Sequence, residues 1–529
     1  MSYIFMKILE RKPASYDAGI AKYSAGDFAK VRKEMRSLVK PGDRVLDVGC
    51  GPGTFATECA KKGATVEAVD ISPEMLYAAN LAAKKAGVEE KIRFQNASAT
   101  EIEADHGSFD LVVFSLSLSE LREVEQWVAM HSAFDFLKPG GKLVVADEVV
   151  PRALGPRVWY QLRRLMLLAI TYLVTKAITR PVNEMEGKFR ACGFDVERIE
   201  AYERGSLKLV VGTRIERKQA PEALSPDRLP GWTEALGKVC SYFTLAFKAV
   251  PIRTGLYKFG NPSEKSPVLV TANYLLTFAS VKKHLRGLDC YLLVIDTRGI
   301  NVWCSAGKGN FSAEEIHNSL RATRAGDIIE TRTLILPKLS ATGVKYRDVK
   351  QLTGWDAVFG PVYARDIPEY LGNGCVTGRH VKRVRFAFGD RLWVAVPFAF
   401  FVGFLALLPL LVFRRLYSPM IPVIAVAAAF AFPLAFYRLP TNQFFKKGLT
   451  LGLIGAAGGV LFLLVTGAPA KEMVQWSLII VGLTTFIAMD FSGMSPVSNY
   501  SRINEEYHVV VPLLGLIIAS YVAVSFLWG

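Results

Sequence analysis

A single cysteine, Cys304, stands in a run of residues that could do chemistry, Asn-Val-Trp-Cys-Ser-Ala-Gly-Lys at 301–308. The hydrophobic stretch Tyr291–Ile295 precedes this run and predicts a buried strand that leads into it. No zinc or disulfide spacing surrounds the cysteine. A lone cysteine is often a small buried hydrophobic residue, but its thiolate is also a soft metal ligand. The flanking indole and the Gly-Lys pair favour a functional thiol.

The Gly307-Lys308 pair also invites comparison with phosphate-binding loops, in which a lysine follows a glycine-rich turn. Such loops have a glycine five residues before the second glycine and a Ser or Thr after the lysine. Here these two positions hold Val302 and Gly309. We therefore reject a nucleotide-binding loop at this position.

A second segment, Arg44–Gly53, is typical of a strand that ends in a glycine-rich turn. The glycines of this turn are Gly49, Gly51 and Gly53. Without side chains, they let the backbone approach a ligand closely. A strand expected over Thr65–Val69 ends in Asp70, where a carboxylate can accept hydrogen bonds from ribose hydroxyls. The spaced pair Asp47 and Asp70 favours a cofactor site over an ordinary tight turn.

Two later hydrophobic segments, Phe109–Phe114 and Leu137–Val145, continue the pattern of strands and helices. Over roughly residues 1–215 the chain resembles the class I S-adenosylmethionine-dependent methyltransferases, which have a Rossmann-like α/β fold. The resemblance implies that Asp70 holds the ribose of the cofactor and that Ile71 packs on the adenine. The residues that it places along the methionine portion are Asp47, Gly49, Gly51 and Gly53.

Two positions depart from the pattern of that family. Ser98 stands where many members have an acidic residue near the adenine amine, and we include it among the cofactor-binding residues. The segment Ser115–Glu120 lacks the histidines that often follow the fourth strand. The expected cofactor site is therefore largely complete, whereas the substrate pocket is unfamiliar.

Beyond a polar, proline-bearing linker at 216–230, the chain resembles the mercury-methylating corrinoid proteins over roughly residues 231–529. The blocks that carry this resemblance, in order, are Gly255–Tyr257, Gly260–Pro262, Ser266–Tyr274, the cysteine motif and Asp490–Val497. The resemblance implies an α/β corrinoid-binding domain in which Cys304 is the axial ligand of cobalt. The cofactor-binding residues that it implies are Thr271, Asn273, Asn301, Val302, Trp303, Gly307 and Lys308.

The end of the chain is far more apolar than the rest, and 51% of all 529 residues are hydrophobic. Five uncharged apolar stretches follow, each near the ~20 residues that cross a hydrocarbon core as a helix. They are Leu392–Phe413, Tyr417–Tyr437, Leu449–Pro469, Met473–Met489 and Val509–Trp528. We predict an all-α transmembrane domain in contact with membrane lipid, rather than five buried helices of a soluble protein.

The distribution of charge along the chain predicts its orientation in the membrane. The net charge of +16 does not indicate nucleic-acid binding, because the basic residues are scattered along the chain. A basic cluster at 379–391 precedes the first predicted span and favours the cytoplasmic side. The first 44 residues are not typical of a cleavable signal sequence. We expect a multi-pass protein of the cell (inner) membrane with both soluble regions in the cytoplasm.

The seven cysteines are odd in number and widely spaced, which suits a reducing compartment. No CxxC pair occurs, so an iron–sulfur site in this chain is not expected. Loss of a methyl group from cobalt as a carbanion would leave cobalt two electrons short before the next methylation. The resemblance therefore implies a separate ferredoxin-type electron donor with two four-iron clusters.

These observations predict a methyltransferase domain at 1–215, a corrinoid-binding domain at 231–385 and a transmembrane domain of about five helices at 386–529. The leading hypothesis is an enzyme that transfers a methyl group from methyl-Co(III) to Hg(II), supplied as a thiol complex, giving methylmercury. The N-terminal domain would methylate the corrinoid from S-adenosylmethionine. One alternative is a paralogue with another acceptor, such as arsenic. Another is a corrinoid-binding membrane scaffold or sensor fused to a small-molecule methyltransferase.

The apolar segment Val158–Thr175 contains two arginines, Arg163 and Arg164. This pattern is typical of an amphipathic helix that acts as a lid or contacts a membrane. A simple core helix is at least as good an interpretation. The sequence leaves these alternatives open.

Overall fold

A computed structural model of the chain describes residues 6–10, 13–24, 26–175, 179–215, 223–226, 237, 239, 251–375, 386–412, 418–493, 495 and 500–528. The chain divides into two compact units. The N-terminal unit comprises Met1–Glu222 with Leu320–Ile328, and the C-terminal unit comprises Ala223–Ser319 with Ile329–Gly529. Most of the predicted linker 216–230, and positions 379–385 of the basic cluster, lie outside the described residues.

A seven-stranded sheet of order β3-β2-β1-β4-β5-β7-β6 forms the centre of the N-terminal unit. Its strands are β1 (Arg44–Val48), β2 (Thr65–Asp70), β3 (Ile92–Asn96), β4 (Phe109–Ser115), β5 (Leu137–Glu148), β6 (Phe194–Tyr202) and β7 (Leu207–Arg214). Strands β1 to β5 pair in parallel, and β7 pairs antiparallel with β5 and β6. This confirms the expected Rossmann-like α/β fold and places the carboxyl ends of β1 and β2 side by side.

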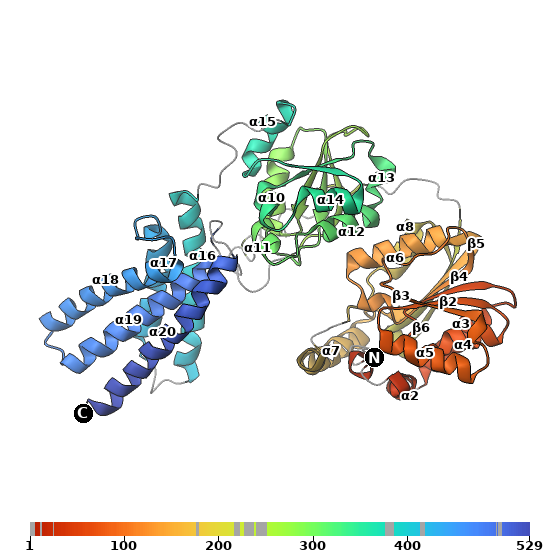
Figure 1. Cartoon of the computed structure of the whole chain (residues 1–529), viewed down its shortest axis with the longest axis horizontal. Coiled ribbons are helices and arrows are strands. Elements are labelled where there is room, and N and C mark those ends of the chain that lie inside the picture. The colour runs from red at the N-terminus through yellow and green to blue at the C-terminus, as the bar shows by residue number, and fades with distance from the viewer. Residues whose placement is uncertain are drawn as a thin grey trace. The chain divides into compact units, whose positions relative to one another are not determined.

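Helices pack on both faces of this sheet (Figure 1). They are α1 (Met6–Leu9), α2 (Pro13–Tyr23), α3 (Asp27–Ser37), α4 (Thr54–Lys61), α5 (Pro73–Lys85), α6 (Glu123–Phe136), α7 (Leu154–Thr175) and α8 (Met185–Cys192). Local sequence explains where α5 begins. The Ser72 hydroxyl accepts a hydrogen bond from the Met75 amide, and Pro73 occupies the first turn, where its missing N–H costs nothing.

The C-terminal unit contains a five-stranded sheet of order β12-β11-β9-β10-β8. Its strands are β8 (Gly255–Phe259), β9 (Val268–Ala272), β10 (Cys290–Ile295), β11 (Thr333–Leu336) and β12 (Asp356–Phe359). Only the edge strand β8 is antiparallel to its neighbour. Every residue of β9 and β10 is buried, as continuous apolar strands of a covered parallel sheet should be. The expected second α/β sheet is confirmed.

Short helices surround this second sheet. They are α10 (Leu275–Leu285), α11 (Val302–Gly307), α12 (Ala313–Thr323), α14 (Tyr346–Thr353) and α15 (Ile367–Gly372), whereas α13 (Ala325–Ile328) is counted with the N-terminal unit. The strand β10 leads through a turn into α11, the helix that carries Cys304.

Apolar helices follow at the end of the chain: α16 (Phe388–Val412), α17 (Met420–Ala435), α18 (Phe444–Val465), α19 (Ala470–Ser492) and α20 (Tyr500–Leu527). Four of them, all but α17, are long and apolar enough to cross a membrane. The predicted span at 417–437 contains α17, whose 16 residues extend ~24 Å, less than the ~30 Å hydrocarbon core. Pro419 directly precedes this helix and disfavours an earlier start, because proline lacks the N–H that a longer helix would use.

Candidate functional site

The glycine-rich turn of the N-terminal unit joins β1 to α4 in a left-handed backbone. Gly49, Gly51 and Gly53 have φ angles of 75°, 53° and 75°, which disfavour any side chain. A Cβ at Gly49 would lie 2.4 Å from the Ser117 Cβ, whereas a Cβ at Gly51 would meet open space. The turn therefore combines tight packing with an open backbone surface that a cofactor can approach.

Asp47, at the carboxyl end of β1, is buried beside this turn with a relative exposure of 1%. Neither of its carboxylate oxygens has a hydrogen-bond partner in the part of the chain that the structure describes. Burial, reinforced by the nearby Asp70 carboxylate, raises the pKa of Asp47 to about 7. A cationic group of a ligand would compensate this buried carboxylate. The site thus fits S-adenosylmethionine, which carries an ammonium and a sulfonium group.

The other predicted residues of this site follow β2 and β3. Asp70 accepts hydrogen bonds from the Gly51 amide at 2.8 Å and from the Ser72 amide at 2.9 Å, so it connects the turn to α5. Ile71 has a relative exposure of 70%, which leaves its side chain available to a planar ring. The Ser98 hydroxyl lies 3.0 Å from the Thr100 hydroxyl. These positions are compatible with the predicted roles, which remain predictions.

A small cavity of about 40 Å³ lies at the turn, and residues from the N-terminal helices also line it. The sequence analysis did not predict these residues. Tyr16 and Asp17 of α2 and Arg32 of α3 lie there beside Asp47. Asp17 and Arg32 form an ion pair of 2.7 Å, and Asp17 also accepts a hydrogen bond from Thr54 at the start of α4. Burial raises the pKa of Tyr16 well above its usual value. No local motif marks these residues, because distant segments meet only in the folded chain.

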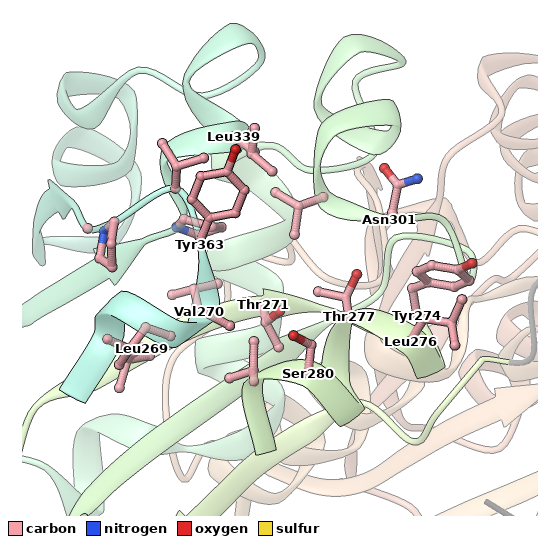
Figure 2. A pocket seen from close by; sticks show the side chains of 18 of the residues that line it. Leu269, Val270, Thr271, Tyr274, Leu276, Thr277, Ser280, Asn301, Leu339 and Tyr363 are labelled. Atoms are coloured by element: carbon pink, nitrogen blue, oxygen red, sulfur yellow. The ribbon is translucent and has the colours of Figure 1, made fainter. Parts of the chain in front are cut away.

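The second candidate site is a pocket of about 430 Å³ in the C-terminal unit. Thr271 of β9 and the Leu336-Pro337 pair at the end of β11 line it, so it lies at the carboxyl ends of neighbouring parallel strands. The chain crosses from β10 on one side of β9 to β11 on the other, which makes this a topological switch point. Figure 2 shows Thr271, Thr277 and Asn301 among the lining side chains.

Cys304 lines this pocket from the short helix α11. Asn301 is the N-cap of that helix, and its side-chain oxygen accepts a hydrogen bond from the Cys304 amide at 2.9 Å. Burial raises the pKa of the Cys304 thiol, against the opposing effects of Asn301 and the Lys308 charge. The thiol donates a weak hydrogen bond of 3.5 Å to the carbonyl of Gly493, at the end of α19. The thiol is therefore protonated at neutral pH, and a metal ion that bound its sulfur would displace the proton.

The structure separates the predicted corrinoid-binding residues into three groups. Thr271, Asn301, Val302 and Cys304 line the pocket. Trp303 is half-buried on the same helix, whereas Gly307 and Lys308 are exposed at its end. Asn273 is buried and holds the preceding turn: its oxygen accepts from the amides of Thr297 and Gly299, at 3.0 and 2.9 Å. Asn273 therefore positions α11.

Several pocket residues were missed from the sequence. Thr277 and Ser280 of α10 lie one helical turn apart and present hydroxyl groups, and Tyr363 adds a third (Figure 2). Two hydroxyl residues three positions apart within the apolar first half of α10 were the sign that the sequence offered. Trp393 of α16 also lines the pocket, so the apolar C-terminal helices contribute to its wall.

Gly343, in the loop after β11, allows that loop to pack closely against α11. A Cβ at this position would lie 2.2 Å from the backbone oxygen of Ala306. Only glycine permits this approach, and any side chain would push the cysteine-bearing helix away. The position of Cys304 thus depends on a residue 39 positions later in the chain.

Comparison with known proteins finds a family that matches the region around the first site. Residues 45–141 match the family described as a methyltransferase domain. This region is a methyltransferase domain. The expected enzyme class, methyltransferase, is thereby confirmed. In solved structures, a SAM-dependent methyltransferase of Methanosarcina mazei is 24% identical, with a TM-score of 0.30, over 35% of this chain and 97% of that chain.

Residues 243–371 match a second family, described as the CO dehydrogenase/acetyl-CoA synthase delta subunit. The acetyl-CoA decarbonylase/synthase complex subunit gamma of Methanopyrus kandleri is 41% identical over 122 residues, 23% of this chain and 26% of the relative. The corrinoid/iron-sulfur protein large subunit of Moorella thermoacetica is 34% identical over 122 residues, 22% of this chain and 27% of the relative. The chain thus spans about a quarter of the length of these relatives.

The two matches agree with the expected pair of cofactors, S-adenosylmethionine and a corrinoid. They support a methyltransferase domain fused to a domain similar to corrinoid/iron–sulfur proteins. The narrower resemblance, to mercury-methylating proteins, and the nature of the methyl acceptor remain predictions.

Proposed function

We propose that this chain is a membrane-anchored, corrinoid-dependent methyltransferase that methylates Hg(II) supplied as a thiol complex. The methyltransferase domain supplies methyl groups from S-adenosylmethionine to a corrinoid held beside Cys304. One observation carries the proposal. Cys304 lines a pocket at the switch point of a domain similar to corrinoid/iron–sulfur proteins, on the same chain as a methyltransferase domain.

The residues around Cys304 fit a metal held in a macrocycle better than a bare metal ion. No group of three or more His, Cys, Asp or Glu residues that could hold a metal occurs among the described residues. A bare ion usually needs three or four protein ligands, whereas a macrocycle supplies the equatorial ligands and leaves an axial position for one thiolate. A bound corrinoid supplies a cobalt centre that carries a methyl group between donor and acceptor.

The side chains of the pocket can then be assigned roles. Cys304 would hold the cobalt of the corrinoid through a soft thiolate, and Asn301 fixes the position of Cys304 through the N-cap hydrogen bond. The apolar walls, which include Leu336, Val302 and Trp393, cover the faces of the macrocycle and exclude water. The hydroxyls of Thr277 and Ser280, which line the pocket, would bind polar substituents of the macrocycle.

In the methyltransferase domain, Asp47 compensates the positive charge of S-adenosylmethionine. The open backbone at Gly51 and the carboxylate of Asp70 provide polar groups for the rest of the cofactor. Asp17, Arg32 and Tyr16 close the cavity from the other side. This arrangement supports the cofactor role that the sequence predicts for the glycine-rich turn.

The proposed function also requires a membrane anchor, an electron donor and a supply of mercury. The apolar helices anchor the chain in the cell membrane, with both soluble regions in the cytoplasm. A ferredoxin-type protein with two four-iron clusters supplies the electrons that renew the corrinoid. Hg(II) arrives as a thiol complex, so the chain needs no separate mercury-binding cluster.

A single-turnover assay on the full-length protein tests this proposal. The protein is loaded with cobalamin, reduced, and given methyl-labelled S-adenosylmethionine, followed by a Hg(II)–thiol complex. We expect label to appear first with the corrinoid and then in methylmercury. Label that reaches the corrinoid and not mercury would contradict the acceptor, and label that never reaches the corrinoid would contradict loading within the chain.

Two variants separate the steps. Cys304→Ala should lower transfer to mercury by at least about a hundredfold, since even changes next to a metal ligand cost 10- to 100-fold. Cys375→Ala, which removes an exposed thiol of the same domain, is the matched control and should keep full transfer. Asp47→Ala should block loading and spare corrinoid binding, and full loading in this variant would contradict the role of Asp47.

A further inference from the structure

Helix α7 of the N-terminal unit is amphipathic, but its polar side packs against the domain and its apolar side is exposed. Tyr160, Arg164 and Thr171 are buried. The exposed apolar side chains are Leu154, Val158, Trp159, Leu162, Leu165, Met166 and Tyr172. These residues recur at helical spacing and form one stripe, the α7 stripe. Since this stripe points away from the domain, the structure excludes the interpretation of α7 as a simple core helix.

A buried polar network fixes this orientation. The guanidinium of Arg164 lies 3.1 Å from Glu148, and the Tyr160 hydroxyl donates a hydrogen bond of 2.6 Å to the same carboxylate oxygen. Arg164 also donates to the backbone carbonyl of Thr179. Turning α7 to bury its apolar stripe would separate a buried ion pair, which is strongly destabilising. The apolar stripe is therefore held outward by the fold itself.

The charges on α7 indicate what covers this stripe. The helix contains no acidic residue. Arg157 and Arg163 lie three residues before and after Tyr160, and so flank the buried side at the two borders of the stripe. Arg157 is exposed and Arg163 half-buried. Apolar residues with a tryptophan, bordered by arginines, are the pattern of helices that lie in the interface of an anionic membrane.

We propose that α7 binds the lipid surface of the membrane in which the chain's own apolar helices are inserted. The inference rests on the proposed membrane anchorage, which keeps a bilayer within reach of the N-terminal unit. The α7 stripe enters the boundary between headgroups and acyl chains, and Arg157 and Arg163 reach the lipid phosphates. The methyltransferase domain is then held on the membrane surface by a second contact, besides its covalent linkage to the apolar helices.

Fluorescence quenching on the full-length protein tests this contact. The chain is reconstituted in nanodiscs that contain phosphatidylcholine and anionic phosphatidylglycerol, with or without brominated acyl chains. The Trp159 signal is the difference between the wild type and Trp159→Phe. We expect brominated lipid to remove most of this signal. Leu162→Glu, which places a charge in the α7 stripe, should abolish the quenching.

Matched variants keep the test specific. Leu81→Glu alters another half-exposed leucine of the same unit, on α5, and should leave the quenching unchanged. Met166→Gln provides a second change in the stripe, at a side chain that is 75% exposed, and should weaken the quenching. Binding of S-adenosylhomocysteine checks that each variant is folded.

Trp159 that is not quenched in a reconstituted chain would overturn the inference and favour a protein partner, such as a second copy. Quenching that persists in both Leu162→Glu and Met166→Gln would also overturn it. Failure of the chain to enter nanodiscs would overturn both the anchorage and the inference. Failure of methyl transfer to mercury in a chain whose Trp159 is quenched would contradict only the proposed function.

Discussion

The two candidate sites occupy equivalent places in two mostly parallel sheets, but the chemistry of their linings differs. Both lie at the carboxyl ends of central strands, where the topology opens a crevice. The first has a cavity of about 40 Å³ that is built from a glycine turn and a buried carboxylate. The second is a pocket of about 430 Å³ with mainly apolar walls and one thiol. Topology thus determines where a ligand binds, and the side chains at that edge determine which ligand fits.

This difference has a physical basis. A charged cofactor is bound by compensating its charge and by hydrogen bonds to backbone groups, which need few residues in fixed positions. A large macrocycle is bound by apolar area and a single directional ligand. The first site should therefore respond to changes of charge, and the second to changes of shape.

Among the changes that contrast the two sites, removing the charge of Asp47 should have the largest effect. Asp47→Asn should weaken S-adenosylhomocysteine binding by about 1.5–3 kcal/mol, the range for a hydrogen bond to a charged group, and leave cobalamin binding unchanged. Calorimetric titration measures the first and absorbance the second. Asp105→Asn, at an exposed position of the same unit, is the control. A variant that loses both ligands equally would break the contrast between the sites.

A change of shape should have the opposite selectivity. Gly343→Ala places a Cβ against Ala306 and should cost about 1–3 kcal/mol, the usual range for overpacking. Because α11 must shift, cobalamin binding should weaken, and binding of S-adenosylhomocysteine should persist. Gly372→Ala meets no atom within 4 Å and serves as the control. If Gly343→Ala bound cobalamin with normal affinity, the position of α11 would not control cobalamin binding, and the prediction would be wrong.

The pH dependence should distinguish the sites next. The pKa of Asp47 is raised to about 7 without ligand, so the carboxyl is neutral below that pH. Because the cationic cofactor needs the ionised form, affinity should fall about tenfold from pH 8 to pH 6 and level off above about pH 7. In the unfolded chain the Asp47 carboxyl ionises at a lower pH than in the fold. Asp47 therefore makes the ligand-free fold less stable as the pH rises from about 4 to about 7. Asp47→Asn should abolish both trends, and a persistent trend would assign them to another group.

The smallest predicted effect is at the N-cap of α11. Asn301→Ala removes the acceptor for the Cys304 amide and should destabilise this helix by about 1 kcal/mol, equivalent to about fivefold in cobalamin affinity. Asn301→Ser keeps an N-cap acceptor and should retain most of the affinity. Equal losses in the two variants would indicate that Asn301 contacts the corrinoid directly and does more than cap the helix.

The local patterns of this chain were readable from its sequence. The strand, glycine turn and second strand that carry Asp47 and Asp70 follow one another along the chain. The cysteine motif also lies within one short segment, and four apolar helices are identified by length and hydropathy alone. Each of these features depends on residues that are close in sequence, where propensity, periodicity and turn chemistry act directly.

The tertiary structure decided the rest. Tyr16 and Arg32 join Asp47 only because the N-terminal helices pack over the turn, and Gly343 positions α11 only because a later loop returns to it. The periodicity of α7 established two faces but not which of them faces the protein. The buried partners of Arg164 settled that question. Sequence periodicity thus determines that a helix has two sides, whereas contacts between distant segments determine which side is buried.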